Sequence, residues 1–248
     1  IGMIFVFGYA IYQALSRGVG DAKTPVFIVL GTVILNFLLD PLFIFGWKFI
    51  PALGVGGAAM ATVLTQAIAL FAGIFVFTSG KKGIHLKLKH FKPDFKLMKK
   101  IIKLGFPISL EQTTRPIGQI IITSLAASFG TIVLASYGIG GQMIGIVIIP
   151  ALSISIANST LVGQNIGAGK IERAEKIAKT SIIIGFVILT LIGILFFIFS
   201  ENIVSIFIKN DLEVIKEGGL FLKLAAITFG FIGIQMAILG ALRGSGNA

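Results

Sequence analysis

The sequence predicts an all-α, polytopic membrane protein, and two observations support this fold class. Of the 248 residues, 56% are hydrophobic and 12% are charged, whereas soluble domains carry roughly 25% charged residues. The apolar residues also gather in runs that match the about 20 residues that a helix needs to cross a bilayer. These runs are apolar on every side, which excludes the short alternating strands of a membrane barrel.

Seven apolar segments follow one another along the chain, and we expect each complete one to span the membrane as a helix. We expect the first to be a truncated span, because the sequence begins with Ile1 inside an apolar run. The fifth is longer than a span requires, and Pro150 within it should kink the helix. The segments are residues 1–16, 24–46, 57–79, 101–128, 132–163, 176–200 and 218–242.

The charges of the loops predict the orientation. Segment 81–100 holds eight lysines and one acid, and residues 164–179 are also basic. The alternate loops, 46–56 and 201–217, carry few cations or an excess of acids. Because basic loops stay on the cytoplasmic side, we expect 81–100 and 164–179 in the cytoplasm of a multi-pass protein of the cell membrane.

Segment 81–100 also divides the chain. Residues 1–80 would hold three helices, and residues 101–248 would hold four. We interpret the segment between them as a cytoplasmic linker that fixes topology, with binding of anionic lipid or nucleic acid as the alternative.

A short motif occurs twice, each time at the end of an apolar helix. It reads Arg-Gly-Val-Gly-Asp-Ala at 17–22 and Arg-Gly-Ser-Gly-Asn-Ala at 243–248. The glycines would end each helix in a tight turn, and the arginine would lie at headgroup level. Six helices separate the copies, so both lie on one membrane face. This predicts a parallel repeat of two six-helix lobes, of which this chain would cover about helices four to ten of twelve.

Two carboxylates lie within the apolar segments. Asp40 and Glu111 are placed where a charge costs about 3 kcal/mol on insertion scales, so we expect each to have a partner or a function. Asn36 lies four residues before Asp40, on the same helix face. Pro41 should free a backbone carbonyl beside them. These are hard oxygen ligands, suited to a sodium ion or to a shared proton.

Other polar residues fall at similar depth. Thr62 and Gln66 share one face of the next helix, and Arg115 lies one turn after Glu111, where the two could form an ion pair. Such a pair would keep Glu111 ionised and make it a poorer proton carrier. Gln66, Gln112 and Gln142 could bind a substrate, as could Gln119, although polar contacts between helices would also explain them.

The sequence shows no enzyme signature. It has no cysteine, its two histidines lie in the basic segment, and no set of residues has metal-ligand spacing. Residues 163–169, GQNIGAG, follow an apolar helix rather than a strand and lack the Gly-Lys-Ser/Thr ending of a phosphate loop. We expect a cytoplasmic turn there.

Several of these motifs together resemble the MATE (multidrug and toxic compound extrusion) transporters. The resemblance rests on RGVGDAKTPVFIVLGTVILNFLLDPLFIFG, LGVGGAAMATVLTQ, LGFPISLEQ, ALSISIANSTLVGQNIGAGKIERAEKIAK and NDLEVIKEG before LRGSGNA. It covers nearly the whole chain. It implies a twelve-helix exporter with two lobes that alternate access. Such an exporter would extrude amphiphilic, mostly cationic molecules in exchange for protons or sodium ions. We expect it to act as a monomer without a cofactor.

The resemblance also implies roles for single residues. Asn36 and Asp40 resemble the N-lobe cation site, which Thr62 would complete, and Glu111 resembles a C-lobe acid used for coupling or substrate binding. A lipid-linked oligosaccharide flippase of the same superfamily is the alternative, which Arg115 favours. An intramembrane enzyme is a more remote one.

Overall fold

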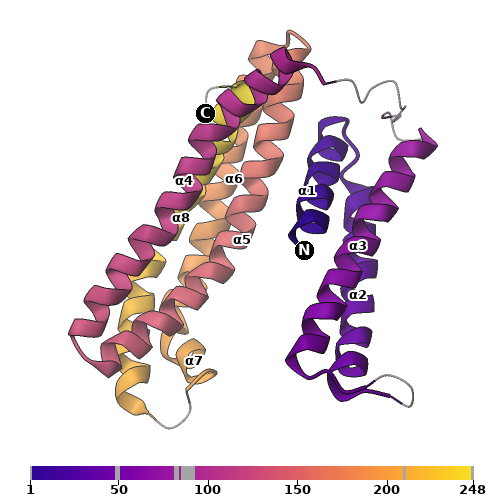
Figure 1. Ribbon diagram of the computed structural model, residues 1–248. Coiled ribbons are helices and arrows are strands. Elements are labelled where there is room, and N and C mark those ends of the chain that lie inside the picture. Colours follow the sequence, from indigo (N-terminus) through magenta and orange to yellow (C-terminus); the bar gives the residue numbers. More distant parts are fainter. Residues whose placement is uncertain (1, 48–50, 81–83, 85–92, 209–210, 247–248) are drawn as a thin grey trace. The chain divides into compact units, whose positions relative to one another are not determined.

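The computed structural model describes residues 2–47, 51–80, 84, 93–208 and 211–246 (Figure 1). Every regular element in these ranges is an α-helix. The chain divides into two compact units, Ile1–Pro93 and Asp94–Ala248, so the division falls within the basic segment 81–100. The helices are α1 Met3–Gly18, α2 Lys23–Phe45, α3 Val55–Ser79, α4 Phe95–Ser128, α5 Thr131–Gly167, α6 Ile171–Ile198, α7 Ser200–Ser205 and α8 Leu212–Ser245.

The first unit packs α1 and α2 against α3. Its core contains Tyr9 and Tyr12 of α1, whose rings stack with centroids 5.6 Å apart, and Phe77 of α3. The Tyr9 hydroxyl donates to the carbonyl oxygen of Pro25 at 2.8 Å and so joins α1 to α2. Gly73 lets Tyr12 lie directly on α3, since a Cβ there would come within 2.7 Å of the ring.

The second unit is built on α5, α6 and α8, which bury Val147, Leu189 and Phe229 between them. Glycines let two of these helices approach closely: a Cβ on Gly185 of α6 would come within 2.8 Å of the carbonyl oxygen of Gly233 in α8. Small residues of this kind are how membrane helices gain van der Waals contact. By contrast, α4 packs mainly against α5 and exposes most of its surface.

Of the helices in the described ranges, five are long and apolar enough to cross a membrane: α2, α3, α5, α6 and α8. The helices at the other two predicted spans do not meet these criteria of length and composition. Helix α1 has only 16 residues, and α4 has 34 residues but is too rich in charged and polar side chains. Segment 101–128 is therefore less apolar than the other complete segments, and its passage through the membrane stays a prediction.

Several predicted boundaries also differ, among them the loop 201–217, of which residues 212–217 belong to α8. Residues 95–100, assigned to the linker, form the first turns of α4, because Asp94 caps that helix. Residues 163–167, expected in a turn, belong to α5, and the turn begins at Ala168. A short helix, α7, follows α6 and was not expected. Helix α5 continues through Pro150, and residues 81–83 and 85–92 of the linker lie outside the described part of the chain.

Candidate functional site

The amide of Asn36 and the carboxylate of Asp40 form a polar pair on α2. Asn36 Nδ2 donates to Asp40 Oδ1 at 3.4 Å, and both residues are half-buried in a helix that is otherwise almost wholly apolar. The helix continues through Pro41. Because proline has no N–H, the carbonyl of Phe37 loses its helical hydrogen bond. The residue that carries this freed carbonyl is next to Asn36 in the sequence.

Thr62 and Gln66 lie on α3, which packs against α2. The Thr62 hydroxyl donates to the carbonyl oxygen of Ala58 within its own helix, at 3.0 Å, and the side chain is exposed. Among the residues that the structure describes, no hydrogen bond joins Thr62 or Gln66 to the α2 pair. The buried threonine of this helix is Thr65, which sequence reasoning did not select.

Glu111 holds two arginines. Arg115, one turn later in α4, donates to Oε1 at 2.9 Å, which confirms the ion pair predicted from the spacing. Arg243, near the end of α8, donates to Oε2 at 2.5 Å. Glu111 is 34% exposed and Arg243 is 23% exposed. Charge-assisted hydrogen bonds of this kind are among the stronger ones, so this cluster ties α4 to α8.

Arg243 belongs to the duplicated motif, which gives that motif a second role. The local geometry of its two copies agrees: Gly20 and Gly246, at equivalent positions, have φ of +86° and +84°. The N–H of each donates to the carbonyl oxygen of the motif arginine, at 3.0 and 3.2 Å. Both copies therefore end their helix as the sequence predicted, and Arg243 of the second copy also pairs with a carboxylate on another helix.

Within the described part of the second unit, Gln112, Gln119 and Gln142 share no hydrogen bond with one another. Gln112 and Gln142 are exposed, on α4 and α5, and Gln119 donates to the Tyr137 hydroxyl at 2.9 Å. The second unit has an apolar hollow of about 250 Å³ where α4, α5 and α8 meet, lined by Tyr137, Phe221 and Glu217 among others. None of the predicted substrate-binding glutamines lines it.

Sequence reasoning also missed Asn158. This residue is buried in α5, and its Nδ2 donates to the carbonyl oxygen of Ala237 in α8 at 2.7 Å. Among the described residues, its Oδ1 has no hydrogen-bond partner. An uncharged amide within a run of small and apolar residues gives little warning in sequence. Across the described ranges, no group of three His, Cys, Asp or Glu could hold a metal ion.

The chain is similar in sequence and in structure to known proteins. A probable multidrug resistance protein NorM of Thermotoga maritima is 31% identical over 96% of this chain, and the probable multidrug resistance protein YoeA of Bacillus subtilis is 29% identical over 99%. A crystal structure of MATE in complex with MaL6 matches 99% of this chain with a TM-score of 0.87 at 24% identity, which shows the fold.

The chain spans about half the length of these proteins: 51% of the first, 53% of the second and 55% of the solved chain. Residues 107–248 match the family model described as MatE. This stretch runs from Pro107 of α4 to the end of the chain and includes Glu111, Arg243 and the core of α5, α6 and α8. The chain therefore belongs to the MatE family.

Proposed function

We propose that the full-length protein is a secondary active exporter of small amphiphilic molecules, which exchanges them for protons or sodium ions by alternating access. The MatE family consists of transporters rather than enzymes, and this chain is part of a multi-pass membrane protein. The related proteins named above are described as multidrug resistance proteins. The observation that carries the proposal is the half-buried Asn36–Asp40 pair in an apolar helix.

The α2 pair is the proposed coupling site. A carboxylate, an amide and the freed carbonyl of Phe37 offer hard oxygens for a sodium ion. A proton could take the place of the sodium ion, because protonation of Asp40 would remove a charge that is costly at this depth. Thr62 would contribute from α3 after a small movement of that helix, because its hydroxyl can accept a ligand while it donates to Ala58.

Glu111 is the second predicted coupling acid, and its surroundings favour a different role. Two arginines hold both of its oxygens, so the carboxylate is stabilised in its charged form. Uptake of a proton would break both ion pairs. We propose that Glu111 acts mainly as a link between α4 and α8.

The proposed substrate is a cationic or neutral amphiphile, contacted by Gln66, Gln112 or Gln142. A pyrophosphate-linked sugar would need cations that are free to bind it. Arg115, the observation that favoured the flippase alternative, is paired with Glu111, and so is Arg243. The relatives named above also lend the flippase no support. We further propose a monomer without a cofactor or a nucleic-acid partner.

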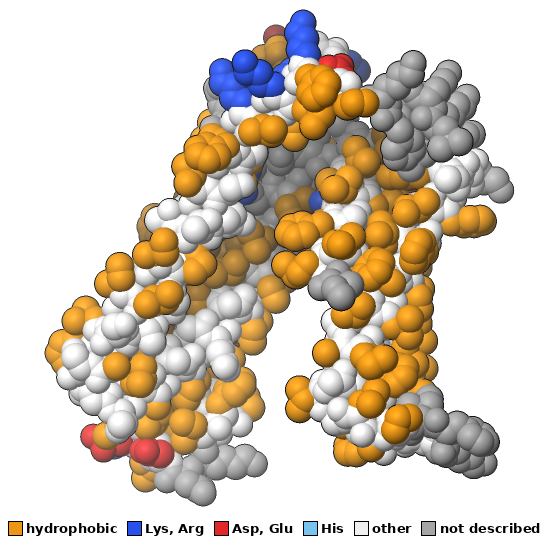
Figure 2. All heavy atoms as spheres, in the orientation of Figure 1, with side chains coloured by type: hydrophobic (Ala, Val, Ile, Leu, Met, Phe, Trp, Pro, Cys, Tyr) orange, Lys and Arg blue, Asp and Glu red, His pale blue; other side chains and the backbone are white. Residues whose placement is uncertain are grey.

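The proposed orientation places 81–100 and 164–179 in the cytoplasm. Figure 2 supports it within the second unit, where Lys and Arg side chains gather at the end at which α4 begins, and acidic side chains gather at the opposite end. The acids there include Asp211, Glu213 and Glu217 at the start of α8.

Asp40→Asn tests the coupling site. It keeps the shape of the side chain and the hydrogen bond to Asn36 but removes the titratable charge. In proteoliposomes of the full-length protein, ethidium transport driven by a proton or sodium gradient should fall at least roughly tenfold, as expected when a coupling charge in the membrane is lost. Glu213→Gln, which neutralises an exposed acid in the first turn of α8, is the matched control and should transport normally. Parental coupled transport by Asp40→Asn would show that Asp40 is structural.

A further inference from the structure

Four lysines follow a single stripe along the first turns of α4. Lys96, Lys99, Lys100 and Lys103 occupy positions i, i+3, i+4 and i+7, which is the spacing of one helix face. At 3.6 residues per turn they fall within an arc of roughly 100°. The helical register is set from the first lysine, because Asp94 Oδ1 accepts the N–H groups of Lys96 and Leu97 at 2.9 and 3.1 Å.

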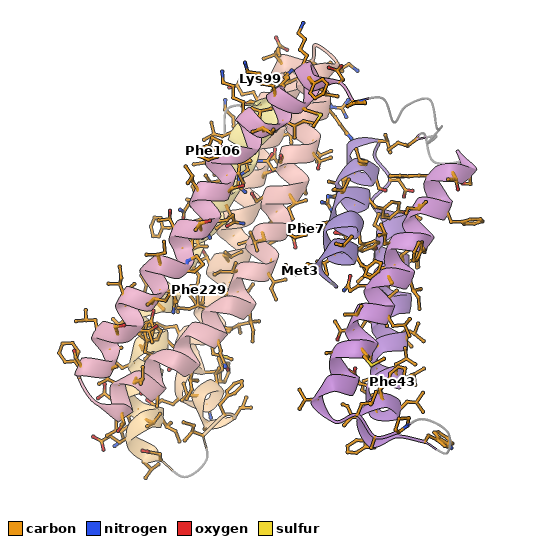
Figure 3. All side chains as sticks on the ribbon, viewed as in Figure 1. Met3, Phe7, Phe43, Lys99, Phe106 and Phe229 are labelled. Carbon is orange, nitrogen blue, oxygen red and sulfur yellow. The ribbon has the colours of Figure 1, made fainter. Side chains whose placement is uncertain are left out.

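The rest of the same turns is apolar. Phe95, Met98, Ile101, Ile102 and Phe106 are 46% to 76% exposed, and every residue from 95 to 104 lies at the surface of its unit. Figure 3 shows Lys99 and Phe106 extending away from α4. These turns thus combine a cationic face with a large uncovered apolar face.

Among the described residues, no ion pair joins an acid to the lysine stripe. Asp94, which caps the helix, is the single acid between residues 94 and 110. The second basic region differs: in α6 and its cap, Lys170, Arg173, Lys176 and Lys179 are interleaved with acids, and Lys179 pairs with Glu175 at 2.7 Å. The two regions have equal numbers of cations, but those of α6 and its cap are spread over roughly 180° of the helix and are partly compensated by Glu172 and Glu175.

The length of α4 places the stripe outside the hydrocarbon core. Its 34 residues extend about 51 Å at 1.5 Å per residue, against a core about 30 Å thick. About two fifths of the helix, roughly 21 Å, therefore exceeds the core. Residues 95–106, which precede Pro107, account for roughly 18 Å of this length. The hydrogen bond that Pro107 removes, to the carbonyl of Lys103, allows a bend there.

We propose that residues 95–106 of α4 bind anionic phospholipids of the cytoplasmic leaflet. The lysine ammonium groups contact the lipid phosphates, and the apolar face lies against the upper part of the acyl chains. Charge complementarity selects this partner, because polybasic segments at a membrane gain affinity from anionic lipids, and apolar faces opposite lysines favour the interface. The proposal goes beyond transport: it depends on the proposed orientation but not on the identity of the substrate.

Lipid retention tests the charge of the stripe. The full-length protein is exchanged into mixtures of phosphatidylglycerol and phosphatidylcholine, and the bound lipids are counted by native mass spectrometry. Replacing Lys96, Lys99, Lys100 and Lys103 together with Gln should reduce the preference for phosphatidylglycerol at least roughly tenfold. A control variant replaces Lys170, Arg173, Lys176 and Lys179 with Gln. It removes the same amount of positive charge but should keep most of the preference for phosphatidylglycerol. Equal losses in both variants, or none in the first, would overturn the proposal.

A charge-conserving variant tests the arrangement. Met98→Lys, Lys99→Met, Ile102→Lys and Lys103→Ile together keep composition and net charge but distribute the lysines around α4. Preference for phosphatidylglycerol should be lost here also. Retention at the parental level would mean that the number of lysines suffices and that the helix face has no role.

The apolar face has its own test. In a tryptophan-free background, Met98→Trp places a fluorophore on that face and Lys99→Trp places one on the cationic face. Phospholipids brominated on the upper acyl chain should quench Met98→Trp strongly and Lys99→Trp weakly. An unquenched Met98→Trp would show that another part of the full-length protein covers this face, and the proposal would fail.

Discussion

At the residue scale, the spacing of charged groups was informative only within one helix. Glu111 and Arg115 are four apart, so their pairing follows from helical geometry. The pairing of Glu111 with Arg243 could not be predicted, because 132 residues separate them and only the packing of α4 near α8 brings them together. This long-range contact changes the interpretation of Glu111 from a coupling acid to a link between helices.

The Glu111–Arg243 pair predicts coupled stability effects. Glu111→Gln and Arg243→Gln should each lower the melting temperature of the purified protein, because each leaves a partly buried charge with fewer partners. The double variant should lose less than the sum, with a coupling energy of about 1 kcal/mol.

Arg115→Gln should have a smaller effect, since exposed pairs within one helix contribute about 0.3–0.5 kcal/mol. Glu175→Gln breaks the more exposed pair with Lys179 and serves as the control. Additive losses at Glu111 and Arg243 would contradict the ion pair.

At the scale of single helices, glycine positions decide how closely the core helices of the second unit pack. Gly185 and Gly233 face each other across α6 and α8, and a Cβ on either would overlap the backbone of the other helix. By contrast, a Cβ added to Gly145 of α5 would meet no atom within 4 Å. The two kinds of glycine look alike in the sequence, and only the packing distinguishes them.

This contrast predicts opposite results for one substitution. Gly233→Ala should destabilise the protein by about 1–3 kcal/mol, the usual cost of overpacking, because α6 and α8 must separate. Gly145→Ala should be neutral or slightly stabilising, since alanine favours the helix. Thermal unfolding in detergent measures both, and equal stability of the two variants would show that the α6–α8 contact is not rigid.

At the scale of the whole molecule, orientation in the membrane remains a prediction. These 248 residues contain no cysteine, so single cysteines introduced into a full-length background without other cysteines test it. Leu53→Cys lies in the loop predicted outside, and Lys170→Cys lies in the turn predicted inside. An impermeant maleimide should label only the first in intact cells that express the full-length protein. Permeabilised cells, in which both should react, control for reactivity. Labelling of Lys170→Cys in intact cells would reverse the orientation.

The sequence by itself determined the helical class, most of the apolar spans, the helix ends at the duplicated motif and the Asn36–Asp40 pair. All of these depend on local chemistry: hydrophobic length, glycine at positive φ and spacing within one helix. It did not reveal that α4 begins at residue 95 with a cationic and an apolar face. The many lysines of 81–100 favoured a linker there, so Asp94 was not recognised as a helix cap.

The tertiary structure alone decided the partners that lie far apart in the chain. It joined Glu111 to Arg243 and Asn158 to Ala237, and it set Gly185 against Gly233. The physical reason is that membrane helices associate through small residues and a few polar contacts rather than through a patterned apolar face. Sequence periodicity therefore reports that a helix spans the membrane, but which residues meet across helices is fixed only when the helices pack.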